Sequence, residues 1–220
     1  MTGASPAGRA RLVLATANAK KLAELARILQ AGGVAADLAG LGEFPGAPDV
    51  RETGATFAAN ALLKARAIAA FTGLPAVADD SGLCVDALNG MPGVLSARWA
   101  GRHGDDEANL RLVLGQLADV PQERRGAQFA CSAALVLPSG REYVSEGIMA
   151  GRIIHEARGG NGFGYDPIFV ADEAQDGTQA QDGTGELTNG ELSADAKDRI
   201  SHRGRALRAL APVIADWLSG

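Results

Sequence analysis

Two adjacent carboxylates, Asp79 and Asp80, stand at the end of a short apolar run and are followed at once by Ser81 and Gly82. Like charges on neighbouring residues repel unless a positive group lies beside them. A divalent cation is the simplest such partner, because hard cations take carboxylate oxygens. Aspartate, serine and glycine are also ordinary turn residues. Taken alone, the stretch fits a metal site and a solvated turn equally well.

Cations that could face such carboxylates come from other segments. Lys20 and Lys21 follow Asn18 at the predicted start of a helix, where positive charge opposes the helix dipole. The arrangement makes more sense if an anion lies over the helix N-terminus, held by free N–H groups and a lysine. Two solvated lysines are the alternative.

Lys64 falls on the apolar face of a helix that is predicted to begin near Thr53 or Thr56 and to end at Phe71. The apolar residues of that face are Phe57, Ala61, Ile68 and Phe71. Asn60 lies one turn before it on the same side. A lysine on an inward face needs an anionic partner or a path to solvent. The two interpretations are a functional anion contact and a side chain whose stem packs while its amine reaches water.

A glycine-rich stretch, GGNGFGYDPIFV at residues 159–170, surrounds Phe163 with four glycines. Glycine lets the backbone approach a ligand closely, and Phe163 or Tyr165 is available to stack on a planar base. The spacing is not that of the dinucleotide fingerprint. The alternative is a flexible turn with an aromatic residue in the core.

A last cluster of cations, Lys197, His202 and Arg203, precedes the final helix. A contact to phosphate or base is at least as well supported as a structural histidine. The chain carries no phosphate loop, zinc motif, nucleophile elbow or CxxC. The remaining groups, with Glu52 added to the two aspartates, suit metal-assisted attack on a nucleoside polyphosphate.

Hydrophobic patterns indicate the elements that position these residues. Strands are predicted at residues 11–17, 74–78, 127–137 and 141–150, and after Pro167. Helices are predicted from Asn18, up to Phe71, over 105–118, from Ser193, and at the C-terminus. Pro138-Ser139-Gly140 is a hairpin signature, and Ile153 and Ile154 extend its second strand. The strand at 74–78 is predicted to end in a polar turn at Asp79.

Composition bounds the classes of function. The chain has 220 residues, 46% hydrophobic and 21% charged, which is ordinary for one globular domain or two small lobes. A net charge of −5 disfavours nucleic acid as a partner. No run is long enough to span a membrane, and the apolar run after Arg11 is too short for a signal peptide. Cys84 and Cys131 are interpreted as buried reduced thiols of a cytoplasmic protein.

Two segments are predicted to lack fixed structure. Residues 1–10 are interpreted as a disordered tail. Residues 172–190 are of low complexity, with QDGT repeated at 175–178 and 181–184, and are predicted to form a mobile surface loop without chemistry of its own.

Six segments together resemble the inosine triphosphate pyrophosphatase family, of the bacterial dITP/XTP pyrophosphatase type that hydrolyses non-standard purine nucleotides. They are TANAKK (16–21), ETGATFAANALLKA (52–65), ADDSGLCVDAL (78–88), PGVLSARWAG (92–101), GGNGFGYDPIF (159–169) and KDRISHRGRAL (197–207). The resemblance runs in the family's order from about Leu12 to the C-terminus. Ala17 departs from the glycine that the family often has, and the 172–185 loop is longer than usual.

The resemblance implies an α/β fold: an elongated mixed β-sheet with flanking helices and two lobes around a central cleft, over residues 11–220. It implies a homodimer, Mg²⁺ as cofactor, and hydrolysis of ITP, dITP or XTP to the monophosphate and pyrophosphate. Asp80 is then the catalytic base and a metal ligand with Glu52; Asp79 completes the candidate metal set. The implied substrate contacts are Thr16, Ala17, Asn18, Ala19, Lys20, Lys21, Asn60, Lys64, Ser81, Phe163, Gly164, Tyr165, Asp166, Lys197, His202 and Arg203.

Two other functions stay open at this point. A related nucleotide pyrophosphatase could prefer another base, such as a pyrimidine. A nucleotide-binding module without turnover would need the cations and glycine loops but not the acidic residues, so the carboxylates argue against it.

Overall fold

The computed structural model describes residues 10–16, 19–31, 33–34, 36–173 and 186–219. By its internal contacts the chain forms two compact units. Unit 1 comprises Met1–Asp80, Ser132–Glu146 and Ala206–Gly220, and unit 2 comprises Ser81–Cys131 and Gly147–Arg205. Nearly all of the predicted tail, and residues 174–185 of the predicted loop, lie outside the described residues. In the part of the chain that is described, no helix is long and apolar enough to cross a membrane.

Within the described part of the chain, six strands form one mixed sheet in the order β2-β1-β3-β4-β5-β6. They are β1 (Arg11–Leu14), β2 (Asp37–Gly40), β3 (Ala76–Val85), β4 (Gly126–Val136), β5 (Glu142–Ile153) and β6 (Phe169–Ala171). β1 pairs in parallel with β2 and with β3, whereas β5 and β6 are antiparallel. The sheet and its flanking helices confirm the predicted mixed α/β class.

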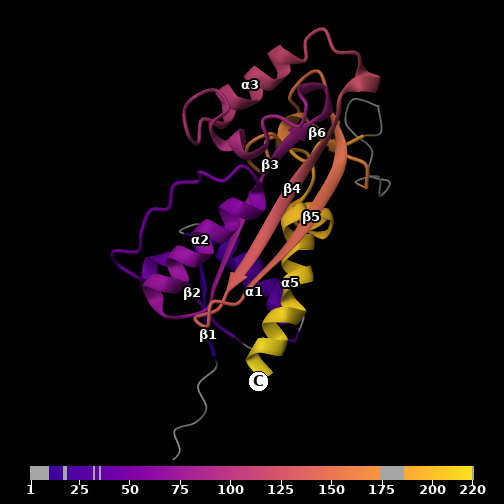
Figure 1. Ribbon diagram of the computed structural model, residues 1–220. Helices are drawn as coiled ribbons and strands as arrows, with labels where there is room; N and C mark the ends of the chain where they lie inside the picture. Colours follow the sequence, from indigo (N-terminus) through magenta and orange to yellow (C-terminus); the bar gives the residue numbers. More distant parts are fainter. Residues whose placement is uncertain (1–9, 17–18, 32, 35, 174–185, 220) are drawn as a thin grey trace, which may run out of the picture. The chain divides into compact units, whose positions relative to one another are not determined.

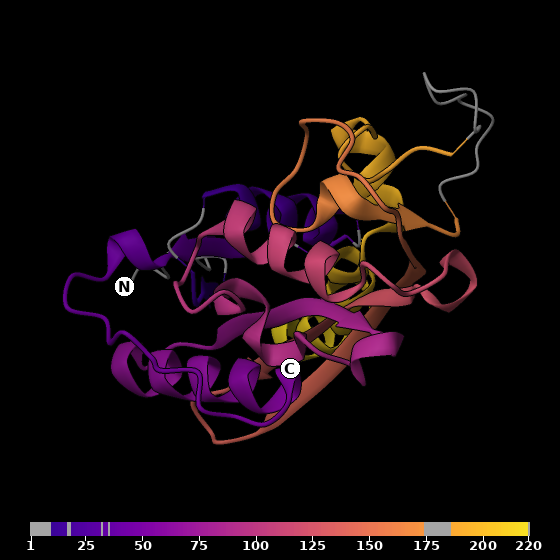
Figure 2. The ribbon, with the colours of Figure 1, turned by 90° about the horizontal axis from the view of Figure 1, so that it is seen from above.

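Unit 1 places one helix on each face of its parallel strands. The chain passes from β1 through α1 (Ala19–Ala31) to β2, then through the 3-10 turn η1 (Leu41–Glu43) and α2 (Phe57–Thr72) to β3 on the other side of β1. Right-handed crossovers in opposite directions put α1 and α2 on opposite faces, as Figure 2 shows. α5 (His202–Ser219) joins this unit from Ala206 onward, where Ser145 Oγ donates to Ala206 O (2.7 Å).

The core under α2 is built mostly from small side chains. The buried members of this cluster are Val13, Ala61, Ala65, Ile68, Ala69, Ala76, Ala78, Ala134 and Val136. Alanine lets a helix backbone come close to the strands it covers, and the packed interior leaves little free volume. α2 is therefore held tightly against the strand that carries the two aspartates.

Unit 2 contains α3 (Asp106–Gln116), α4 (Ala194–Ile200) and four 3-10 turns, η2 (Asp86–Leu88), η3 (Gly93–Arg98), η4 (Gln122–Arg124) and η5 (Asp166–Ile168). Its core joins Leu110 and Val113 of α3 to Leu83 and Val85 of β3 and to Phe129 of β4. Figure 1 labels α3 at the top of the view, near the end of β3. The spacing of the inward residues is the one that predicted the helix.

Several predicted element boundaries are confirmed. α2 begins after Thr56, whose Oγ accepts a hydrogen bond from the Ala59 N–H (3.1 Å), and α4 begins after Ser193, whose side chain accepts from the Ala196 N–H. β4 and β5 are neighbours joined by a short turn, which is the predicted hairpin, and β5 continues to Ile153.

Three predictions are wrong. The strand expected to end at Ala78 continues as β3 to Val85. Phe71, placed on the apolar face of α2, is 48% exposed. Cys84 is half-buried rather than buried, although it is a free thiol like Cys131.

Arg125 holds the end of α3. It is 1% exposed, and its guanidinium donates to three backbone oxygens: Val120 O (3.0 Å), Ile154 O (3.0 Å) and Leu117 O (2.6 Å). Leu117 is the C-cap of α3, so the cation satisfies a carbonyl that the helix leaves open. Burial lowers the pKa of Arg125 from its ordinary value.

Replacing Arg125 with leucine leaves these carbonyls without their donor. We expect Arg125→Leu to lower the free energy of unfolding by about 3 kcal/mol, measured by urea denaturation. The exposed neighbour Arg124 supplies the control, since Arg124→Leu should stay within about 0.5 kcal/mol of the parent. Equal stabilities of the two variants would contradict a structural role for Arg125.

Candidate functional site

Asp79 and Asp80 lie inside β3, and they are 6% and 8% exposed. Side chains alternate along a strand. Asp80 therefore shares the face of Ala76 and Ala78, which pack in the α2 cluster. Asp79 takes the opposite face. The alternative of a solvated aspartate turn is wrong, because both residues are buried strand residues.

Ser96 explains why β3 continues where turn residues predicted its end. A Cβ on Gly82 would lie 2.4 Å from Ser96 Oγ, so only glycine lets the backbone at residue 82 approach Ser96 this closely. Ser96 Oγ accepts from the Leu83 N–H (2.9 Å) and donates to Gly93 O (2.6 Å). This serine was not among the predicted site residues; its position in the PGVLSARWAG segment was the available signal.

Asn60 connects the start of α2 to β3. It is fully buried, and its Nδ2 donates to Asp80 Oδ2 (2.9 Å) while its Oδ1 accepts from the Gly54 N–H (2.7 Å). Both ends of the amide are thus satisfied. The Glu52–Gly54 segment and Asp80 are tied to the same side chain.

Lys64 lies one turn beyond Asn60 and joins two carboxylates. Its Nζ donates to Glu52 Oε1 (2.6 Å) and to Asp80 Oδ1 (3.2 Å). The side chains of Lys64, Glu52 and Asp80 are 17%, 24% and 11% exposed. The inward lysine therefore has anionic partners within the chain, and snorkelling is not needed to explain it.

Burial and charge act in opposite directions on this cluster. Burial lowers the pKa of Lys64, but Asp80, Glu52 and the more distant charge of Asp79 outweigh it, so the pKa is raised. Burial and, to a smaller extent, the charge of Glu52 raise the pKa of Asp80 more than Lys64 and Asn60 lower it, so this pKa is raised as well. The carboxylate of Asp80 is a stronger base than an exposed aspartate.

The two carboxylates fit a hard divalent cation. Glu52 and Asp80 converge on one ammonium, so their oxygens border the same small volume. Magnesium-type ions commonly take one or two carboxylates and complete their shell with water and phosphate oxygens. Within the described ranges, no three acidic, histidine or cysteine residues gather as a potential metal cage. Asp79, the third predicted ligand, faces the other side of β3.

The first predicted phosphate segment is described only in part. Thr16 lies just beyond β1, and its carbonyl accepts from the Leu41 N–H (3.3 Å). Ala17 and Asn18 lie outside the described residues, as do the side chains of Ala19, Lys20 and Lys21, although the helix α1 begins at Ala19 as predicted within one residue. Their roles stay predictions.

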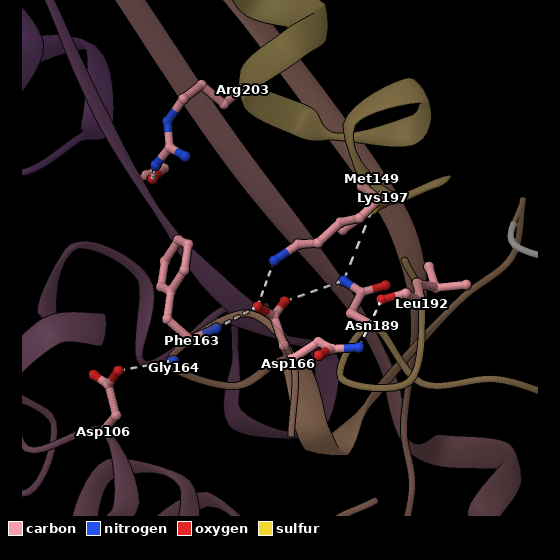
Figure 3. Close-up of polar contacts among 11 residues, drawn as sticks. Asp106, Met149, Phe163, Gly164, Asp166, Asn189, Leu192, Lys197 and Arg203 are labelled. Atoms are coloured by element: carbon pink, nitrogen blue, oxygen red, sulfur yellow. Dashed lines mark hydrogen bonds and ion pairs between the residues drawn. The ribbon is translucent and has the colours of Figure 1, made fainter. Parts of the chain in front are cut away.

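In unit 2 the glycine loop closes around Asp166 (Figure 3). Asp166 is 2% exposed, and its Oδ2 accepts from the Phe163 N–H (2.8 Å) and from Lys197 Nζ. The Lys197 Nζ also lies 4.9 Å from the centroid of the Phe163 ring. A Cβ on Gly162, whose φ is +80°, would lie 2.2 Å from Asp166 Oδ2, so a glycine is required there.

The two aromatics of this loop have different roles. Phe163 is 61% exposed, which leaves its ring accessible for stacking. Tyr165 is 4% exposed, and its hydroxyl donates to Ser96 O (2.8 Å). Burial, followed by the charge of Asp106, raises the pKa of Tyr165. Phe163 is thus the candidate stacking residue, and Tyr165 anchors the loop.

The start of α5 lies near Ser81 within unit 2. Arg203 Nη2 donates to Ser81 Oγ (3.4 Å), as the upper part of Figure 3 shows for the guanidinium. His202 stacks on Phe129, with ring centroids 5.1 Å apart and planes 13° apart. Both His202 and Arg203 are 8% exposed. Of the predicted cation cluster, Arg203 therefore contacts Ser81, whereas His202 packs against the core residue Phe129.

Asp106 and Asn189 also contact the loop, and both were missed from the sequence. Asp106 Oδ2 accepts from the Gly164 N–H (2.9 Å), and Asn189 Nδ2 donates to Asp166 Oδ1 (3.4 Å). Neither residue stands in one of the segments that carried the resemblance. No pattern in the sequence pairs them with a loop that lies 58 or 23 residues away.

The chain is similar to known proteins over almost its whole length. A family model described as "Ham1 family" matches residues 12–213. A relative from Streptomyces coelicolor named dITP/XTP pyrophosphatase is 57% identical over 94% of this chain and 98% of its own length. The name agrees with the family that the sequence segments resemble.

Solved structures are similar as well. A Mycobacterium abscessus structure titled nucleoside-triphosphatase / dITP/XTP pyrophosphatase is 53% identical, with a TM-score of 0.73 over 92% of this chain and 99% of that one. A HAM1 protein from Coxiella burnetii is 40% identical, with a TM-score of 0.82 over 94% of this chain and 99% of that one. By sequence and by fold, this chain belongs to the Ham1 family.

Proposed function

We propose that this protein is a Mg²⁺-dependent pyrophosphatase that hydrolyses ITP, dITP and XTP to the monophosphate and pyrophosphate, and so removes non-standard purine nucleotides from the nucleotide pool. The proposal rests on the sequence similarity that relatives named dITP/XTP pyrophosphatase share with this chain over almost its full length. The partly buried group of Glu52, Lys64 and Asp80 supports it, since anhydride hydrolysis needs charge stabilisation and a base.

The residues of unit 1 supply the hydrolytic chemistry in this proposal. Glu52 and Asp80 would hold Mg²⁺, which would supply positive charge for the polyphosphate. Asp80 orients a water for attack on the α-phosphorus and accepts its proton. Lys64 offsets charge on the departing pyrophosphate. Thr16 to Lys21 contact the polyphosphate.

Residues of unit 2 select the base. Phe163 stacks on the purine, and Ser81, Gly164, Tyr165, Asp166 and Lys197 line the base and sugar. A 6-keto purine accepts hydrogen bonds from His202, Arg203 or backbone N–H groups. A 6-amino purine leaves those donors unpaired, which can cost about 10⁴-fold in specificity.

A homodimer, which the resemblance implies, and a cytoplasmic location, which the two cysteines interpreted as reduced thiols favour, belong to the same proposal. A single two-lobed domain over residues 11–220 stays a prediction. The mobile loop predicted at 172–190 stays a prediction only for residues 174–185, which lie outside the described residues, because Thr188 and Asn189 are fully buried. A pyrophosphatase of different base preference and a binding module without turnover are separated from this proposal by the first experiment below.

Pyrophosphate release from ITP, dITP, XTP, dTTP and ATP tests the activity. With Mg²⁺ we expect turnover of the three non-standard purine nucleotides and kcat/KM values for ATP lower by about 10³-fold or more, because unpaired donors disfavour the 6-amino group. Chelation of Mg²⁺ should abolish turnover. Comparable rates on ATP would contradict the selectivity, and tight ITP binding without product would indicate the binding module.

Asp80→Asn tests the catalytic base. The amide keeps the size of the side chain and can still accept from Asn60, but it cannot take a proton. We expect kcat on ITP to fall by about 10²–10⁴-fold. The circular dichroism spectrum should match that of the parent, which shows that the fold is retained. The exposed Asp119 gives the control, because Asp119→Asn should leave kcat unchanged. Near-parental turnover of Asp80→Asn would remove Asp80 from this role.

Lys64→Met tests the charge balance without relying on turnover. In this variant, and without a divalent ion, Glu52 and Asp80 have lost their shared cation. We therefore expect the free energy of unfolding to fall by about 3 kcal/mol, which corresponds to a melting temperature lower by about 6–12 °C. Mg²⁺ should restore more stability to this variant than to the parent, because it neutralises the same carboxylates.

Arg66→Met is the matched control on the same helix. Arg66 makes an exposed two-point ion pair with Glu142, with Nε–Oε1 and Nη2–Oε2 distances of 2.6 and 2.7 Å. Its loss should cost about 1 kcal/mol or less and should not change the Mg²⁺ response. An equal Mg²⁺ response of Lys64→Met and Arg66→Met would contradict a metal at Glu52 and Asp80.

A further inference from the structure

Asn189 is a buried polar residue with no role in the chemistry above. It is 0% exposed, and its backbone N–H donates to Phe169 O (2.8 Å) at the start of β6. The neighbouring Gly190 N–H donates to Asp166 O (3.0 Å), and the Asn161 N–H donates to Gly190 O (2.9 Å). The turn that carries Asn189 is thus fixed by backbone hydrogen bonds against both β6 and the glycine loop.

The side chain of Asn189 reaches the carboxylate that organises this loop. Its Nδ2 lies 3.4 Å from Asp166 Oδ1, while Oδ2 of the same carboxylate accepts from the Phe163 N–H and from Lys197. Figure 3 shows the three donors arranged around Asp166. A carboxylate can rotate about its Cβ–Cγ bond, and a donor on Oδ1 favours the orientation in which Oδ2 faces Phe163 and Lys197. The same Nδ2 also lies 4.0 Å from Met149 Sδ.

The orientation of Asp166 in turn decides how Phe163 is presented. Its Oδ2 fixes the backbone of Phe163 and also holds the Lys197 ammonium, which lies over the Phe163 ring. The ring is largely exposed, so few packing contacts restrain it. Its position depends on the Lys197 ammonium over the ring and on two backbone hydrogen bonds, from the Phe163 N–H to Asp166 Oδ2 and from the Asp166 N–H to Phe163 O (3.3 Å).

The other end of the Asn189 amide indicates why an asparagine stands here. Its Oδ1 is buried and has no hydrogen-bond partner among the described residues. An unsatisfied buried oxygen is destabilising, and an apolar side chain of the same size would avoid it. Packing alone therefore does not explain the residue, whereas donation to Asp166 does.

We propose that Asn189 is a positioning residue for base recognition: through Asp166 it holds Phe163 and Lys197 in the arrangement on which a purine stacks. This inference rests on the proposed function for its substrate. The residue acts without touching the nucleotide, and its loss affects binding of the base more than the hydrolytic step.

Two variants of Asn189 test the proposal. Asn189→Leu removes the donor at similar size, and Asn189→Asp keeps size and shape but sets a second carboxylate against Asp166. With ITP as substrate we expect KM to rise about tenfold, with kcat within about twofold of the parent. The same substitutions in a Phe163→Ala background should add little, because the positioned ring is then absent.

The matched control is Thr188→Val, in the adjacent position. Thr188 is also fully buried, and its Oγ donates to Arg158 O (2.8 Å) without contacting Asp166. The isosteric change removes one buried hydrogen bond of the same turn. It should lower the melting temperature without changing KM.

Hydrogen exchange of the free protein supplies a readout that needs no substrate. In the Asn189 variants the amides of residues 160–168 should exchange faster than in the parent and in Thr188→Val, because the Phe163 N–H loses a fixed acceptor. Unchanged KM and exchange in Asn189→Asp would overturn the proposal. If the parent enzyme does not hydrolyse ITP, the proposed function fails, whereas the exchange result still decides whether Asn189 positions the loop.

Discussion

The structure of unit 1 depends on an ammonium shared by two carboxylates. A buried charge is tolerated only with a partner of opposite sign and a set of hydrogen bonds. Lys64 supplies the charge for Glu52 and Asp80, and Asn60 supplies the hydrogen bond that completes Asp80. The three charged residues come from α2, from the segment before it and from β3. The parallel strands and their crossover helix are what bring these segments together.

Much of the secondary structure follows from the local sequence. The caps at Thr56 and Ser193 and the Pro-Ser-Gly turn are chemical signals that act within a few residues, and each element appears where its signal predicts. β3 is the instructive exception. Its Asp-Asp-Ser-Gly run carries turn propensity, but Asn60 and Lys64 accommodate Asp80, and Ser96 closes over Gly82. These contacts come from far along the chain, so a local reading could not contain them.

Site residues could be predicted from the sequence where their type did not fit the hydrophobic or charge pattern around them. Lys64 was conspicuous as a charge on an apolar face, and Asp79 and Asp80 were conspicuous as neighbouring like charges. Asn189 and Ser96 are single polar residues in ordinary surroundings, and only the packed chain gives them a partner. The different roles of Phe163 and Tyr165 could not be predicted from the sequence either, since exposure is a property of the fold and not of the residue type.

The alanine layer beneath α2 sets a limit on how this protein can diversify. Trimming such a layer removes almost nothing, whereas each added methyl group must displace the helix. Because Asn60 and Lys64 are carried by that helix, bulkier residues at Ala61, Ala65 or Ala69 would alter the spacing of the charged group from a distance. Evolutionary drift in this part of the interior is thereby constrained by electrostatics, even though none of its side chains bears a charge.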